Sequence, residues 1–191
     1  MTHKSVKGQL LLDGGRLAGS WFHRTVVLVC EHNAEGAFGL VLTKASDSRV
    51  EDVLEGEFGD RIGGLTLYGG GPVQLAALSF LRGIDQALDV VGATQALVLP
   101  GLALGHQLDD LLALAQPTPT PPPVRVFAGY AGWSAGQLDD ELLRDSWLVE
   151  PATLEWVFVV PPEQLWRQIL KRRPNWQERL LADSPEDAGW N

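Results

Sequence analysis

Short apolar runs, separated by turn-forming residues, dominate the pattern of this sequence and predict a sheet of many strands. The clearest run lies at residues 25–31, where valine, leucine and cysteine follow one another up to Glu31, as in a strand that is covered on both faces. A turn at residues 33–36 leads into a second run at residues 37–42, and this spacing predicts a β-hairpin. Further strands are expected at residues 10–12, 65–68, 75–81, 89–91, 97–99, 124–130 and 154–160.

Apolar residues that recur at intervals of three and four predict the helices. Three are expected at residues 50–58, 104–115 and 137–145. A last helix is expected to begin at Pro162, because proline suits the first helical position. The basic residues at 171–173 would then lie at the negative end of that helix's dipole.

A proline-rich stretch at residues 117–123 bears on the domain organisation. Proline fixes φ and disfavours helix in the residue before it, so this stretch must be extended. It could link two domains, but the part of the chain that follows is near the size at which an isolated core becomes marginal. We therefore interpret it as a stiff connection within one domain that spans residues 1–191.

Composition and charge exclude several classes of function. The chain has 24 acidic and 15 basic residues and a formal net charge of −9, which opposes direct nucleic-acid binding through a broad basic surface. Cys30 is the only cysteine, so an intrachain disulfide and a four-cysteine zinc site are excluded. No apolar stretch has the length of an export signal or a membrane span. We expect a cytoplasmic protein without a metal or cofactor.

Two motifs suggest hydrolytic chemistry. Residues 132–136 fit the pattern G-x-S-x-G around Ser134, but every histidine precedes this serine, whereas a hydrolase with this motif needs one after it. Ser134 and Gln137 also fit a helix-capping box, in which the Ser134 oxygen accepts the Gln137 amide. Cys30 and His32 combine a thiol with an imidazole, and strand alternation predicts that they share one face while Glu31 lies on the other. We interpret Cys30 as a core residue.

Glycine, tryptophan and acidic residues allow both structural and functional interpretations. The glycines at 69–71 could cradle an anion, but Pro72 has no amide to donate, and a tight turn that needs positive φ is the favoured cause. Trp147, Trp156 and Trp166 are expected in the core, whereas Trp133 could line a groove. The acidic residues at 139–141 are expected to form a solvated helix face.

Three segments, taken in order, resemble the YqgE/AlgH family of bacterial proteins. They lie at residues 22–44, 68–73 and 129–148 and contain the sequences FHRTVVLVCEHN, YGGGPV and GYAGWSAGQLDDE. The resemblance implies an α+β fold, a single domain in which helices surround a bifurcated, partly barrel-like mixed sheet. It also implies a protein without established enzymatic activity, and members are described as candidate transcriptional regulators. Thr43 and Ala45 replace the family's usual asparagine and proline, and Leu81 lies where members often have histidine.

The leading hypothesis is a non-enzymatic binding or regulatory protein that acts through a protein or small-molecule partner. The resemblance implies that its binding surface brings together eight residues from the matched segments, namely Glu31, His32, Asn33, Lys44, Gly70, Gly71, Trp133 and Gln137. The alternative hypothesis is a small hydrolase that uses Ser134 or Cys30 as its nucleophile.

Overall fold

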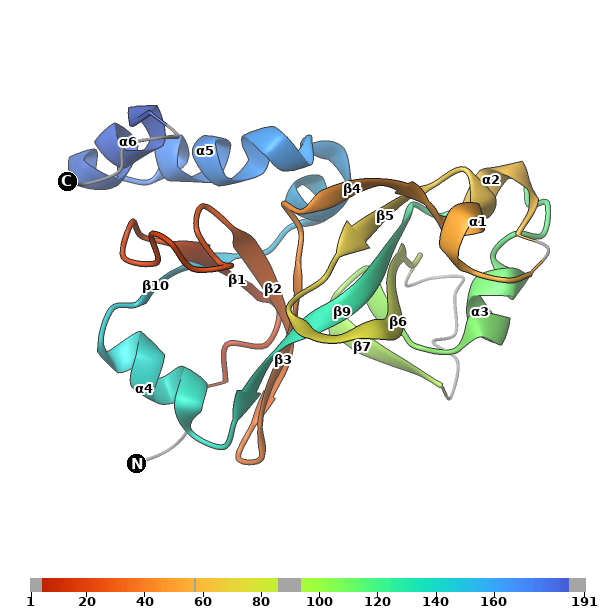
Figure 1. Cartoon of the computed structure of the whole chain (residues 1–191), viewed down its shortest axis with the longest axis horizontal. Coiled ribbons are helices and arrows are strands. Elements are labelled where there is room, and N and C mark those ends of the chain that lie inside the picture. The colour runs from red at the N-terminus through yellow and green to blue at the C-terminus, as the bar shows by residue number, and fades with distance from the viewer. Residues whose placement is uncertain (1–4, 57, 86–93, 186–191) are drawn as a thin grey trace.

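The computed structural model describes residues 5–56, 58–85 and 94–185, which form one α+β domain around a strongly curled sheet (Figure 1). The strand predicted at residues 89–91 lies outside the described residues. Strand pairing follows the order β10-β1-β2-β3-β9-β6-β8-β7, and β4 and β5 branch from this path. The strands are β1 (Gln9–Asp13), β2 (Val26–Asn33), β3 (Gly36–Val41), β4 (Ala45–Arg49), β5 (Thr66–Gly69), β6 (Val73–Gly83), β7 (Gln95–Leu99), β8 (Leu102–Gly105), β9 (Val124–Ser134) and β10 (Trp147–Pro151).

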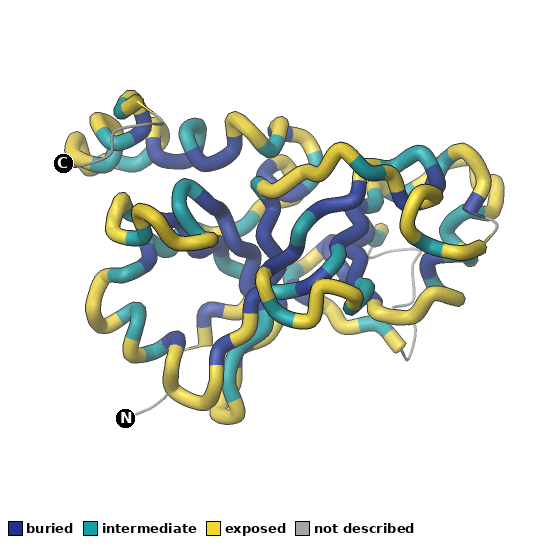
Figure 2. Tube along the Cα trace, viewed as in Figure 1, coloured by how far each residue is buried: buried dark blue, intermediate teal, exposed yellow. Residues whose placement is uncertain are grey.

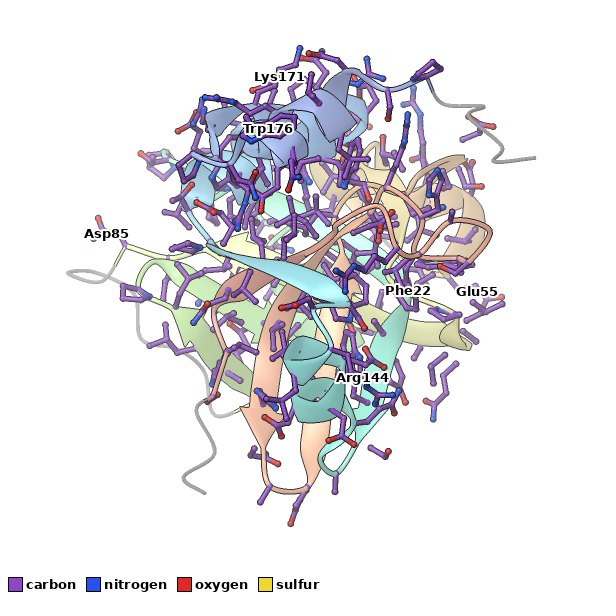
Figure 3. All side chains as sticks on the ribbon, turned by 90° about the vertical axis from the view of Figure 1, so that its left-hand side faces the viewer. Phe22, Glu55, Asp85, Arg144, Lys171 and Trp176 are labelled. Atoms are coloured by element: carbon purple, nitrogen blue, oxygen red, sulfur yellow. The ribbon has the colours of Figure 1, made fainter. Side chains whose placement is uncertain are left out.

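Short helices surround this sheet. The bounds are α1 (Val50–Val53), α2 (Gly59–Gly63), α3 (Leu108–Ala113), α4 (Gln137–Leu143), the π-helix η1 (Glu155–Val159), α5 (Pro162–Arg172) and α6 (Trp176–Asp183). Helices α1, α2 and α3 lie at one end of the molecule, and α4, α5 and α6 lie toward the other (Figure 1). Figure 3 shows the outer surface of this second end, with Lys171 and Trp176 on the α5–α6 pair and Arg144 just after α4.

Strand β9 makes the sheet bifurcate, because it pairs with three other strands. Along one edge, residues 126–128 pair in parallel with β5, and residues 131–134 then pair antiparallel with β3. Along its other edge, β9 pairs antiparallel with β6. The bifurcated, partly barrel-like mixed sheet that the family resemblance implies is therefore confirmed.

The glycines at 69–71 connect strands at the fork of the sheet, which is the point between residues 128 and 131 of β9 where its partner changes from β5 to β3. The Gly70 amide donates to Ala128 O at 2.9 Å, and Gly70 O accepts from the Val41 amide at 2.8 Å, so one residue links β9 to the end of β3. A Cβ atom at Gly71 would overlap the backbone of Tyr130. The prediction that these glycines form a tight turn with positive φ was wrong. None of the three has positive φ, and close backbone approach excludes a side chain at positions 70 and 71.

Buried residues follow the central strands of the sheet (Figure 2). Alternate residues of β1 and β2 pack into two different clusters, so the core lies on both faces of the sheet. The largest cluster combines alternate residues of β1 and β2 with the inner face of α5, including Leu165, Trp166 and Ile169. The expected start of α5 at Pro162 is confirmed, and so is the burial of Trp147, Trp156 and Trp166. The basic residues at the end of α5 form ion pairs, among them Lys171 with Asp183 at 2.8 Å.

Three predicted elements differ from the structure. The strand expected at residues 154–160 is a π-helix, and the helix expected at 50–58 is reduced to α1. Leu104, expected in a helix, lies in β8, and α3 begins only at Leu108. The apolar runs at residues 102–105 and 154–160 fit helix and strand alike, and pairing with β6 or packing against the α5 core decides between them.

The proline-rich stretch packs against the domain. Pro123 O accepts the Gly83 amide at 2.9 Å, and Pro122 O accepts from Arg61 Nη2 at 2.7 Å. These bonds tie it to β6 and to α2, as expected of a connection within one domain and not of a free linker.

We expect Gly71→Ala to destabilise the fold by about 3 kcal/mol, because the added methyl group would overlap backbone atoms that cannot rotate away. Gly69→Ala is the matched control, since its Cβ would meet Lys44 Cβ at 3.7 Å, an ordinary contact. That change should alter stability by less than about 1 kcal/mol. Urea unfolding of both variants measures the difference, and equal midpoints would contradict this account of the fork.

Candidate functional site

A cleft opens where β6 separates from β9. Val73 pairs with Tyr130 and Leu78 pairs with Ala128, so four residues of β6 lie opposite the single residue Gly129. This bulge carries Leu75 outward, with 70% of its surface exposed. The cleft beside it has a volume of about 620 Å³ and is lined by Ala37, Phe38, Val73, Gln74, Ala77, Leu78, Ser79, His106, Tyr130, Gly132 and Trp133.

Aromatic rings form one wall of this cleft. The Phe38 ring lies 4.9 Å from the Tyr130 ring, and 5.5 Å from the His106 ring in an edge-to-face arrangement. Offset and edge-to-face contacts of this kind hold rings in fixed positions. The cleft therefore presents a mostly apolar, preformed surface.

One polar pair interrupts the apolar lining. Ser79 Oγ lies 3.0 Å from His106 Nδ1, and Ser79 is almost fully buried. Which of the two atoms donates depends on the imidazole tautomer. The pair can offer a hydrogen bond to a ligand at the base of the cleft, or it can transfer a proton between serine and histidine.

Three of the eight expected binding residues meet in a neighbouring hollow. Glu31, Asn33 and Trp133 line it together with Phe38 from the cleft wall, and its volume is about 210 Å³. Of the eight, Trp133 is the one that also lines the larger cleft. The Asn33 side chain accepts from the turn backbone at Glu35 N over 2.8 Å.

His32 and Cys30 lie on opposite faces of β2, so the prediction that they share a face was wrong. A β-bulge between Val29 and Glu31 shifts the alternation by one residue. Cys30 packs in the core with Leu28, and burial raises the pKa of its thiol above the ordinary value. His32 instead accepts the Val6 amide at Nδ1 over 3.2 Å, and its Nε2 lies 3.7 Å from Asp139 Oδ2.

The remaining expected residues have structural contacts of their own. Lys44 Nζ lies 5.0 Å from the centre of the Trp21 ring. The Gly69 and Gly70 amides both donate to backbone carbonyls, which leaves neither free to hold an anion. Gly71 packs on Tyr130, as described above. The structure therefore does not bring all eight residues into one cavity.

The helix cap predicted at Ser134 was also wrong. Ser134 ends β9, and Gly136 in a left-handed conformation precedes α4. The Gln137 side chain accepts from the Ser134 amide at 3.1 Å and from Ser134 Oγ at 3.2 Å. Only one half of the capping box has formed, with the serine as donor, because β9 extends four residues beyond the predicted strand.

Glu141 connects the tryptophans behind the site. Its Oε2 accepts from Trp133 Nε1 at 2.9 Å and from Trp147 Nε1 at 2.7 Å, while its Oε1 accepts from Gln137 Nε2 at 3.0 Å. The expectation of a solvated acidic face holds for Asp140, which pairs with Arg144, and fails for Glu141. This carboxylate fixes the orientation of both indole rings.

Ser79, His106 and Tyr130, which line the cleft, were not predicted from the sequence as binding residues. Ser79 and His106 stand alone in the sequence, 27 residues apart, without a motif around either. They meet because β8 pairs with β6 and brings His106 beside the bulge. Tyr130 lies in a segment that carries the family resemblance, and this resemblance is the signal that could have indicated a role for it.

The described ranges contain neither a candidate metal site nor a candidate membrane-spanning helix. Histidine, cysteine and carboxylate side chains there do not gather in groups of three or more that could hold a metal ion. None of the helices in those ranges has the length and apolarity to cross a lipid bilayer.

Comparisons with known proteins, by sequence and by fold, point to the same family. A sequence model described as AlgH-like, DUF179, matches residues 10–175. A UPF0301 protein of Chlorobaculum parvum is 40% identical over 187 residues, which cover 96% of this chain and 95% of that protein. Another from Streptomyces avermitilis is 35% identical over 196 residues, with 98% and 96% covered.

Two solved structures share the fold. The solution structure of the AlgH protein from Pseudomonas aeruginosa matches with a TM-score of 0.73 and 30% identity, over 98% of this chain and 100% of that one. The crystal structure of a Corynebacterium diphtheriae protein matches with a TM-score of 0.76 at 23% identity, over 97% and 95%.

We expect Glu141→Ala to cost about 2 to 4 kcal/mol of stability, because it leaves two buried indole N–H groups without an acceptor. Asp140→Ala is the control one residue away. Its carboxylate is 69% exposed and lies 4.0 Å from Arg144, so its loss should cost less than about 0.5 kcal/mol. Denaturant unfolding followed by tryptophan fluorescence checks both values, and a stable Glu141→Ala variant would refute this role.

Proposed function

This chain belongs to the AlgH-like DUF179 family, and on that premise we propose that it is a non-enzymatic cytoplasmic binding protein with a regulatory role. In this proposal the cleft beside β6 takes a small, flat, largely apolar molecule. Binding of that molecule alters how the protein engages a protein partner.

The observation that carries the proposal is the composition of the cleft. A volume of about 620 Å³ lies in the range of small-molecule sites, which are mostly apolar with a few placed polar groups. The rings of Phe38 and Tyr130 supply stacking surfaces. The pair formed by Ser79 and His106 supplies one point of hydrogen bonding that would set the orientation of the ligand.

Both nucleophiles of the hydrolase hypothesis are poorly placed for catalysis. Ser134 Oγ donates to the Gln137 amide oxygen, which cannot act as a general base. Cys30 is buried, and its raised pKa keeps it as the unreactive thiol. Ser134 and Cys30 therefore give the hydrolase hypothesis little support.

A regulatory role is supported by the way the cleft is built. Its walls come from β3, β6 and β9, and the bulge that closes one side carries the exposed Leu75. A ligand in the cleft would contact the inner side of this bulge at Ala77. It would thereby change a surface that a partner can reach.

We expect the uncharged fluorescent probe N-phenyl-1-naphthylamine to bind saturably with one site per chain. Ala77→Phe fills the cleft and should weaken binding about tenfold, which corresponds to about 1.4 kcal/mol. Leu75→Phe adds the same ring to the outside of the same bulge and should leave affinity unchanged. A titration followed by fluorescence measures this, and equal affinity in both variants would remove the cleft as the site.

A second candidate function, serine-dependent hydrolysis in the same cleft, is favoured by the distance of 3.0 Å between Ser79 Oγ and His106 Nδ1. His106 would take the serine proton as Oγ attacks an acyl carbon and would return it to the leaving group. Against this, no carboxylate of the described residues bonds His106 to orient it. Ser79 also sits inside a paired strand opposite Phe127.

We expect no labelling of Ser79 by a fluorophosphonate probe beyond the rate seen with unfolded protein. Ser79→Ala serves as the control for the assignment, and peptide mass spectrometry identifies the labelled residue. Fast labelling that disappears in Ser79→Ala would replace the binding proposal with the hydrolase.

A further inference from the structure

A buried arginine precedes Gly129 in β9, whereas the β9 residues that line the cleft follow Gly129. Arg125, in the first half of β9, is 8% exposed. Its guanidinium lies 4.9 Å from the centre of the Tyr68 ring. Its Nη1 donates to Leu42 O at 3.5 Å and its Nη2 donates to Val160 O at 3.4 Å.

These contacts compensate poorly for a buried charge. Hydrogen bonds from an N–H group to an oxygen normally span about 2.7 to 3.2 Å between nitrogen and oxygen, so both bonds of Arg125 are long. A charge taken out of water is costly unless a counter-charge and short hydrogen bonds accompany it. Burial accordingly lowers the pKa of Arg125 from its ordinary value.

Other arginines of this chain show the usual solution. Arg173, at the end of α5, pairs with Glu150 at 2.7 Å and with Glu178 at 2.5 Å. No carboxylate of the described residues pairs with Arg125 in this way. The chain has a net charge of −9, yet this guanidinium is buried without a carboxylate partner among the described residues.

A second guanidinium faces the same space. Arg61 of α2 donates to the carbonyls of Leu114 and Pro122, and likewise has no carboxylate partner within the described ranges. Both arginines line a pocket of about 400 Å³ between α2, the proline-rich stretch, β9 and η1. Its other walls are mainly apolar and include Ile62, Leu65 and Phe158.

We propose that this pocket is a binding site for a small organic anion, whose phosphate or carboxylate group lies between Arg125 and Arg61. Planar guanidinium groups match both kinds of anion through paired N–H donors. The body of the ligand would pack on Ile62, Leu65 and Phe158. No residue of this pocket lines the cleft beside β6, so the two sites can be tested separately.

The site is tested by calorimetric titration of the full chain with inorganic pyrophosphate and, in a second arm, with succinate. Sodium chloride at matched ionic strength is the reference. We expect saturable binding of at least one of the two, and the stronger arm identifies the anionic group. Arg125→Met should weaken binding at least tenfold, and Arg61→Met should weaken it at least threefold.

Arg144→Met is the matched control, because it removes the same charge from an exposed position on another part of the chain, where Arg144 is 71% exposed. Its affinity should equal that of the original chain. Equal binding in Arg125→Met, Arg61→Met and Arg144→Met would overturn the proposal, as would the absence of saturable binding in both arms.

Folding of the variants is checked by thermal unfolding in sodium chloride alone. Arg125→Met keeps the apolar stem and removes an uncompensated charge, so its midpoint should not fall. If that variant does not fold, Arg61→Met carries the test. Unchanged binding of N-phenyl-1-naphthylamine to Arg125→Met separates this site from the cleft, so either proposal can fail alone.

Discussion

Gly70 and Gly71 lie against the backbone of β9 at the point where that strand changes partners, and no Cβ atom fits between the two segments. This close approach lets β5 and β3 follow one another along one edge of β9, with Gly70 bonded to both β9 and the end of β3. Without it, two separate sheets would each expose an unpaired edge, which proteins avoid. The change of partner along β9 depends on this contact.

Both cavities follow from the same fork. Strand β9 contributes Arg125 before the bend at Gly129 and Tyr130 after it, and each lines a different pocket. On one side, β6 bulges away because four of its residues, between Val73 and Leu78, lie opposite the single residue Gly129 of β9. On the other side, the prolines at 121–123 line the second pocket together with Arg61 and Arg125.

The candidate site was only partly predictable from the sequence. Glu31, Asn33 and Trp133 do meet at one hollow, and this grouping came from the family resemblance. The position of His32 was missed because one bulge at Cys30 reverses the alternation of β2, and bulges leave no reliable mark in a run of apolar residues. Ser134 was misplaced because β9 continues through Gly132, which a pattern of propensities would treat as a break.

The sequence by itself determined the hairpin of β2 and β3, the start of α5 at Pro162 and the exclusion of a disulfide, because periodicity, proline geometry and cysteine number are local properties. Tertiary structure alone decided that residues 155–159 form a helix, that Ser79 meets His106, and that Arg125 is buried with no carboxylate partner among the described residues. Each of these depends on segments far apart in the chain, where pairing between strands and packing between layers override what neighbouring residues prefer.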